Sequence, residues 1–134
     1  MIEYVLDTDI CIYWLKGSEA IKRKVKQIGP DSLRTTIFTL AELKYGAFNS
    51  HNVRTNLQNI QSFLSKVVVL NFDEDAAEKF GKIKADLRKQ GQLIEDFDIL
   101  IASSVLSHGG TLVTNNVTHF KRIPELNYEN WLQE

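Results

Sequence analysis

The sequence has little of several features that define particular classes of protein. Its single cysteine, Cys11, cannot form a disulfide within the chain, and its apolar neighbours predict a buried core thiol. No apolar run approaches the roughly 18 residues that a membrane-spanning helix needs. The first residues, MIEYVLDTD, lack the basic and apolar regions of a signal peptide. We therefore expect a cytoplasmic protein that does not enter a membrane.

The charge balance is also unremarkable, because 16 basic and 17 acidic residues give a net charge of −1. This balance provides no overall basic signal for a nucleic-acid partner. The basic residues are nevertheless grouped, so local electropositive faces are compatible with the sequence. The groups are Lys22, Arg23, Lys24 and Lys26, then Lys82, Lys84, Arg88 and Lys89, and finally Lys121 with Arg122.

The length of 134 residues and the 43% hydrophobic content predict one folded domain over residues 1–134. Short apolar or β-branched runs alternate with longer segments of helical periodicity. Strands are expected at 4–6, 33–39, 67–70 and 111–114, helices at 10–15, 18–28, 39–48, 51–64, 73–90 and 96–108, and a polar turn at 115–119. This alternation predicts an α/β fold with a short parallel sheet and helices on both faces, in which sites gather at the carboxyl ends of strands.

Three carboxylates occur in unusually apolar surroundings. Asp7 ends the first predicted strand, and Glu42 and Asp98 lie within apolar helices. Buried carboxylates require a partner, and hard oxygen donors suit Mg²⁺ or Mn²⁺. The histidines are dispersed and the only cysteine is isolated, which argues against zinc.

Each of these residues also has a purely structural interpretation. Asp7 or Asp9 could be the N-cap of the following helix, with Asp9 favoured because Asp7 belongs to the strand. Thr39 with Glu42 fits a capping box. Near Asp98, either Glu95 or Asp96 could serve as a first-turn charge or cap. The Asp-Thr-Asp triplet also matches the start of haloacid-dehalogenase-like phosphatases, but the later Gly-Asp-x-x-x-Asp pattern of that family is absent.

Four stretches in order, LDTDICIYW, TLAELKYGA, LIEDFDILIASS and LVTNNVTHFKRIPEL, resemble the sequence landmarks of PIN-domain ribonucleases, specifically the VapC toxins of bacterial VapBC toxin–antitoxin pairs. This resemblance implies a three-layer α/β/α domain that cleaves RNA endonucleolytically with Mg²⁺, or with Mn²⁺ in its place. It also implies that Asp7, Glu42 and Asp98 form the acidic metal site. The EDFD form of the third stretch is similar to that of members that cut initiator tRNA.

The fourth stretch departs from the family pattern. Family members usually carry an acid at one of two positions, which are Asn116 and His119 in this chain. Asn116 completes our set of expected catalytic residues, since its amide oxygen can ligate a hard metal weakly, although it could also be a simple turn residue. We expect His119 to be exposed or packed rather than a ligand, because a lone imidazole suits zinc better than magnesium.

The resemblance also implies partners, which are a VapB-type antitoxin, an RNA substrate of the tRNA class, and a second copy in a homodimer. Basic residues should surround an acidic site that accepts RNA, and the groups at 22–26 and 121–122 are the candidates. Thr8 and Thr114 are candidates for the site wall, and Trp14, Tyr45 and Phe48 for apolar anchors. The alternative function is a PIN-like module that binds antitoxin or RNA without cutting.

Overall fold

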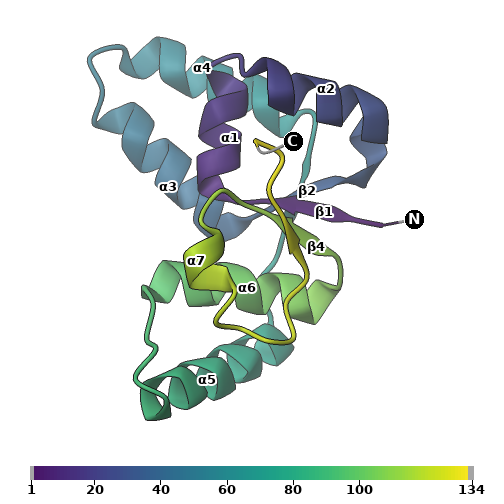
Figure 1. Ribbon diagram of the computed structural model, residues 1–134. Coiled ribbons are helices and arrows are strands. Elements are labelled where there is room, and N and C mark those ends of the chain that lie inside the picture. Colours follow the sequence, from purple (N-terminus) through teal and green to yellow (C-terminus); the bar gives the residue numbers. More distant parts are fainter. Residues whose placement is uncertain (1, 133–134) are drawn as a thin grey trace.

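The computed structural model describes residues 2–132, and its centre is a parallel sheet. Five strands within that range are ordered β3-β2-β1-β4-β5, and every neighbouring pair is parallel (Figure 1). They are β1 (Tyr4–Leu6), β2 (Leu33–Thr36), β3 (Val68–Leu70), β4 (Thr111–Val113) and β5 (Tyr128–Glu129). The predicted short parallel sheet is confirmed.

Helices cover both faces of this sheet (Figure 1). One layer contains α1 (Thr8–Leu15), α2 (Glu19–Ile28), α3 (Ile37–Phe48) and α4 (Val53–Leu64). The other contains α5 (Glu74–Lys89) and α6 (Asp96–His108), with the short α7 (Val117–Phe120) beside them. A short 3₁₀ helix, Pro30–Ser32, leads into β2. The three-layer α/β/α arrangement is therefore confirmed.

The central strands are buried on both faces, which explains why they are continuously apolar in the sequence. Val5 and Leu112 pack with residues of α5 and α6 in one core cluster. Leu6 and Val113 pack with residues of α1 to α4 in the other. Since successive side chains of a strand point to opposite faces, each central strand joins the two cores.

Several predicted boundaries agree with the structure, and others move for local reasons. Helix α6 spans Asp96–His108 as expected. The second strand ends at Thr36 rather than at residue 39, because the extended Thr36 accepts a hydrogen bond from the Thr39 amide and thereby caps α3. Helix α1 begins at Thr8 rather than at residue 10, and the expected polar turn at 115–119 contains the start of α7.

The cysteine and the lengths of the helices agree with the sequence. The Cys11 side chain is fully buried, and this burial raises the pKa of its thiol, so it is the core residue that was predicted. Between residues 2 and 132, no helix combines the length and the apolar character needed to cross a membrane.

Candidate active site

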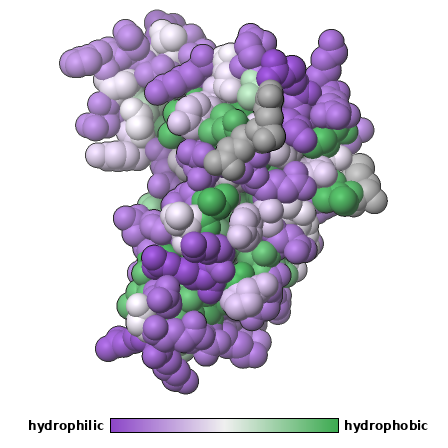
Figure 2. Space-filling view, in the orientation of Figure 1, coloured by the Kyte–Doolittle hydropathy of each residue, from purple (hydrophilic) through white to green (hydrophobic). Residues whose placement is uncertain are grey.

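The candidate site lies where the order of the sheet reverses direction. From β1 the chain proceeds to β2 and β3 on one side and then returns to β4 and β5 on the other. Asp7 follows β1 directly, and Thr114 follows β4. The first turns of α1 and α3 and helix α7 lie on this side of the sheet (Figure 1), and the surface is indented there (Figure 2). Parallel α/β sheets bind their ligands at such switch points.

Asp7 is the buried centre of the site, with 6% of its surface exposed. It is the N-cap of α1, and its Oδ1 accepts a hydrogen bond from the Thr8 amide at 2.8 Å. Its Oδ2 accepts one from the Thr114 hydroxyl, also at 2.8 Å. The predicted place of Thr8 and Thr114 in the wall of the site is thus supported by contacts that hold the Asp7 carboxylate in one orientation.

The electrostatic setting of Asp7 is unfavourable for a bare carboxylate. Burial raises the pKa of Asp7 to about 7, and the negative charges of Asp9 and Asp98 add to this effect. The hydrogen bonds from Thr114 and Thr8 oppose the rise but do not cancel it. Such a group at the carboxyl end of a strand would be stabilised in its charged form by a cation.

Of the two candidates for the N-cap of α1, Asp7 occupies the cap position and the favoured Asp9 does not. The Asp9 carboxylate instead accepts hydrogen bonds from the Ile10 amide at 2.7 Å and from the Asn115 amide at 3.0 Å. Burial raises the pKa of Asp9, and these two amides lower it. Asp9 therefore ties the loop after β4 to the start of α1.

Glu42 is also not part of the capping box suggested by the sequence, because Thr36 caps α3. The Oε1 atom of Glu42 accepts a hydrogen bond of 2.7 Å from the hydroxyl of Thr8. The same hydroxyl lies 3.1 Å from that of Thr39, a site contact that the sequence did not reveal. The Glu42 carboxylate thus faces the first turn of α1, next to the residue that holds Asp7.

Asp98, the third carboxylate, lies next to two residues of the fourth stretch, Asn116 and His119. Asp98 Oδ2 lies 2.9 Å from Nδ1 of His119, and Nδ2 of Asn116 lies 2.9 Å from the same nitrogen. His119 is half-buried, as a packed surface residue would be, and it contacts the Asp98 carboxylate. The backbone amide of Asn116 donates to the Thr114 hydroxyl at 2.9 Å, which connects this cluster to Asp7.

The predicted basic rim is only partly present. Lys22 lies beside Trp14 and Lys66, at the end of α1 opposite to Asp7, and pairs with Glu19 at 3.8 Å. An eight-residue helix is about 12 Å long, so Lys22 is far from the carboxylates. Arg122 donates to the carbonyls of Gln92 and Leu93. The exposed Lys121, directly after α7, remains the basic residue placed best for the rim.

The donor set fits a hard divalent cation with an incomplete protein shell. Within residues 2–132, no three His, Cys, Asp or Glu side chains are close enough to hold one ion together, so Asp7, Glu42 and Asp98 do not form a ready-made triad. Mg²⁺ usually keeps several waters and uses only one or two carboxylates plus substrate oxygens. Asp98 lies close enough to Asp7 for its charge to raise the pKa of Asp7, so two carboxylates are near one another at this place.

Comparison with known proteins identifies relatives along nearly the whole chain. Residues 4–126 match the family model of the PIN domain. The chain is 37% identical over 131 residues to the tRNA(fMet)-specific endonuclease VapC of Shigella flexneri, covering 98% of this chain and 99% of the relative. It is 40% identical over 134 residues to Ribonuclease VapC2 of Haemophilus influenzae, covering 98% of this chain and all of the relative.

Solved structures of toxin–antitoxin complexes also contain chains similar to this one. VapBC2 from Rickettsia felis, bound to a DNA fragment of its promoter, contains a chain with a TM-score of 0.92 and 32% identity, covering 97% of this chain and 99% of that chain. VapBC-1 from nontypeable Haemophilus influenzae contains one with a TM-score of 0.90 and 36% identity, covering 98% of this chain and all of that chain.

Proposed function

Because the chain belongs to the PIN-domain family, and within it to the VapC ribonucleases, we propose that it is a toxin that hydrolyses a phosphodiester bond of tRNA with a divalent metal ion. The observation that carries the proposal is the buried Asp7 carboxylate at the sheet switch point, with the charges of Asp9 and Asp98 beside it. The initiator tRNA named for the Shigella flexneri relative is the first substrate to test, and the cytoplasm is where tRNA would be met.

In this proposal Asp7 and Asp98 hold Mg²⁺ or Mn²⁺, while Glu42 and the Asn116 amide hold its water shell or the substrate. When bound, the ion makes water more acidic and offsets the charge that develops on the phosphate. Thr114 and Thr8 keep the Asp7 oxygens oriented, and Asp9 fixes the Asn115 loop. The water oxygen forms the new P–O bond, one ester P–O bond breaks, and the leaving oxygen gains the proton that the water loses, so no covalent enzyme intermediate is required.

The experiment is cleavage of a tRNA panel by the purified chain with Mg²⁺, with Mn²⁺ and with EDTA. We expect cuts at one position in few tRNAs, loss of cutting in EDTA, and recovery when the ion is returned. Cutting that continues in EDTA would contradict the metal requirement.

A second function has an observation in its favour, because no three acidic or histidine side chains of the described part converge on one ion. The chain would then be a module that binds antitoxin or RNA without cutting. If tRNA is retained in a gel-shift assay while neither ion supports cleavage, this function replaces the first.

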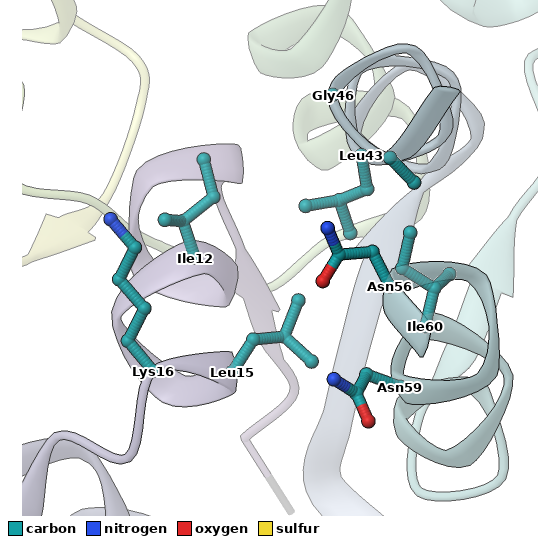
Figure 3. Close-up of a pocket in the computed structure, with 9 residues that line it drawn as sticks. Ile12, Leu15, Lys16, Leu43, Gly46, Asn56, Asn59 and Ile60 are labelled. Atoms are coloured by element: carbon teal, nitrogen blue, oxygen red, sulfur yellow. The ribbon is translucent and has the colours of Figure 1, made fainter. Parts of the chain in front are cut away.

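The partner that we propose is a VapB-type antitoxin, since the solved structures named above are VapBC complexes. A hollow of about 410 Å³ lies between α1, α3 and α4, with Ile12, Leu15, Leu43 and Ile60 turned toward one another and Lys16 on the rim (Figure 3). Ile12 lies one turn after Thr8 in α1, and Gly46 lies one turn after Glu42 in α3. An apolar segment in this hollow would therefore extend toward the site. We propose that an antitoxin segment fills it.

Gly46 allows this contact to be tested with a matched pair of variants. A Cβ at Gly46 would meet nothing within 4 Å, so Gly46→Ala should retain the fold and stabilise α3 by about 0.5–1 kcal/mol. Gly46→Trp should occupy the hollow and weaken antitoxin binding at least about tenfold. Titration calorimetry with a VapB-type antitoxin measures the Kd of both variants, and an unchanged Kd for Gly46→Trp would refute this docking site.

The predicted homodimer has a candidate surface on α3. Ile37, Tyr45 and Phe48 lie on one side of the helix and are 44%, 69% and 65% exposed. Large exposed side chains on one helix face are typical of interfaces, and aromatic residues often dominate the binding energy. We propose that a second copy covers them.

Replacing Tyr45 and Phe48 together by glutamate should therefore raise the dimer dissociation constant at least about tenfold. Sedimentation velocity over a concentration series measures this constant. The control is Leu93→Glu, because Leu93 is also exposed, at 46%, but lies in the loop before α6. If the dimer dissociation constant rises equally in Leu93→Glu and in the double variant, the α3 surface is not the interface.

A further inference from the structure

We propose that the exposed ring of Phe97 is a stacking surface for an unpaired base of the RNA, beside the phosphate that is cut. Phe97 directly precedes Asp98 in α6 and is 43% exposed. The inference rests on the proposed cleavage of tRNA. It adds a contact that positions the substrate without touching the reacting atoms.

Phe97 lies beside the site because two helices each bring an aromatic residue there next to a polar one. On α6, Phe97 precedes Asp98, one of the site carboxylates. On α3, Phe38 precedes Thr39, whose hydroxyl contacts the first turn of α1. The ring centroids of Phe38 and Phe97 are 6.3 Å apart, so the two rings meet where the first turns of α3 and α6 border the site.

Other aromatic and apolar side chains support this ring. Phe38 meets Phe72 nearly edge-on, with ring centroids 5.0 Å apart and an interplanar angle of 84°. Phe38 also packs against the buried core cluster that the sheet forms with α5 and α6. Phe97 therefore rests on a fixed support and keeps an open face. Such a ring can stack on a base with little loss of side-chain entropy, since it has only two rotatable bonds.

The charges near Phe97 suit an anionic partner better than the acidic sequence around it suggests. Asp96 directly precedes Phe97, but Lys84 pairs with the Asp96 carboxylate at 2.9 Å. Arg122 donates to two backbone carbonyls in the loop before α6, and these neutral acceptors leave its positive charge in place. An RNA strand on this side of the site would therefore meet two cations near the start of α6.

Single-stranded RNA is the occupant that these features favour. The unpaired bases of RNA loops stack on aromatic side chains, while their phosphates are attracted to nearby cations. A base stacked on Phe97 would hold its phosphate near Asp98, because the two residues are consecutive. The rival occupant is a second copy of the chain. Charged groups so close to the ring are unlike the charge-depleted centre of a protein interface.

The test compares RNA binding by full-length chains in which Asp7→Asn slows cutting. Fluorescence anisotropy at one salt concentration gives the Kd for a short unstructured RNA and for an abasic oligomer of equal length. Phe97→Ala removes the ring, Phe97→Leu keeps an apolar side chain without a flat face, and Phe97→Tyr keeps the face. The control is Val68→Ala, because Val68 is 53% exposed at the amino end of β3, away from the site.

We expect Phe97→Ala and Phe97→Leu to weaken binding of the unstructured RNA about tenfold. Phe97→Tyr and Val68→Ala should bind it as the parent chain does. The abasic oligomer should bind equally to all of these chains, because it keeps the phosphates and lacks the bases. An unchanged Kd for the RNA in Phe97→Ala, an equal loss with the abasic oligomer, or a parent chain that does not prefer the RNA to the abasic oligomer overturns the inference.

The rival occupant is measured on the same variants. Sedimentation velocity gives the dimer dissociation constant of Phe97→Ala and of its parent chain. If this constant rises about tenfold while the Kd for RNA does not change, Phe97 belongs to the contact between two copies and the inference is wrong.

The inference and the proposed function can fail separately. If the chain with Asp7 intact cuts tRNA while Phe97→Ala binds RNA normally, the function stands and the stacking contact is refuted. If Phe97→Ala weakens RNA binding but no tRNA is cut, the contact stands and the chain binds RNA without cutting it.

Discussion

Asp7→Asn is expected to lower the rate of tRNA cleavage at least about 100-fold, with Asp98→Asn having an effect of similar size. An amide keeps the shape of the carboxylate but removes the negative charge that would hold a divalent ion. Loss of one electrostatic group in an active site commonly costs two to three orders of magnitude in rate. Initial rates on one labelled tRNA in saturating Mn²⁺ provide the measurement.

The control for this experiment is Asp86→Asn, because Asp86 is an exposed residue of α5, on the opposite layer from α1 and α3. It should cut at the rate of the unmodified chain. If Asp7→Asn cuts as fast as Asp86→Asn, Asp7 is not part of the catalytic site.

Asp7→Asn is also expected to raise the free energy of unfolding of the metal-free protein at high pH. Burial raises the pKa of Asp7 from 3.8 to about 7. Between pH 4 and pH 7, the folded state therefore keeps a proton on Asp7 that the unfolded state has lost. Stability should therefore fall as pH rises from about 4 to about 7, and stay low above that. Asparagine has no charge to desolvate, so its advantage should grow over this range to at most about 4 kcal/mol.

Urea unfolding in EDTA at pH 4, 6 and 8 measures the difference between Asp7→Asn and the unmodified chain. Any cost of the altered hydrogen bonds to Thr8 and Thr114 is nearly independent of pH, so the change with pH reports the charge itself. Added Mn²⁺ should then stabilise the unmodified chain and have little effect on the variant. A difference that stays constant from pH 4 to pH 8 would contradict the raised pKa.

The parts of the fold that the sequence predicted well depend on local patterns. Helix α6 is apolar on nearly all sides and ends at a glycine, and Asp73 caps α5 within its own segment. Asp7 was singled out because it directly follows a buried strand, and its carboxylate is indeed buried after β1. In each case the relevant residues are neighbours in the sequence.

The local interpretations that the structure replaces concern residues whose partners are far away in the sequence. Glu42 could be read locally as a capping residue, but it faces Thr8, which precedes it by 34 residues. Asp9 could be read as a cap, but it binds the Asn115 amide, 106 residues away. His119 appeared isolated because Asp98 lies on another helix, and only the folded sheet brings α6 and α7 together.

The chemical end groups of the cleaved tRNA test the central claim most directly. Hydrolysis by water with a divalent ion at Asp7 and Asp98 predicts a linear monophosphate on one product and a free hydroxyl on the other, formed only when Mg²⁺ or Mn²⁺ is present. A 2′,3′-cyclic phosphate, formed equally well in EDTA, would show that the RNA's own 2′-hydroxyl is the nucleophile and would contradict the account.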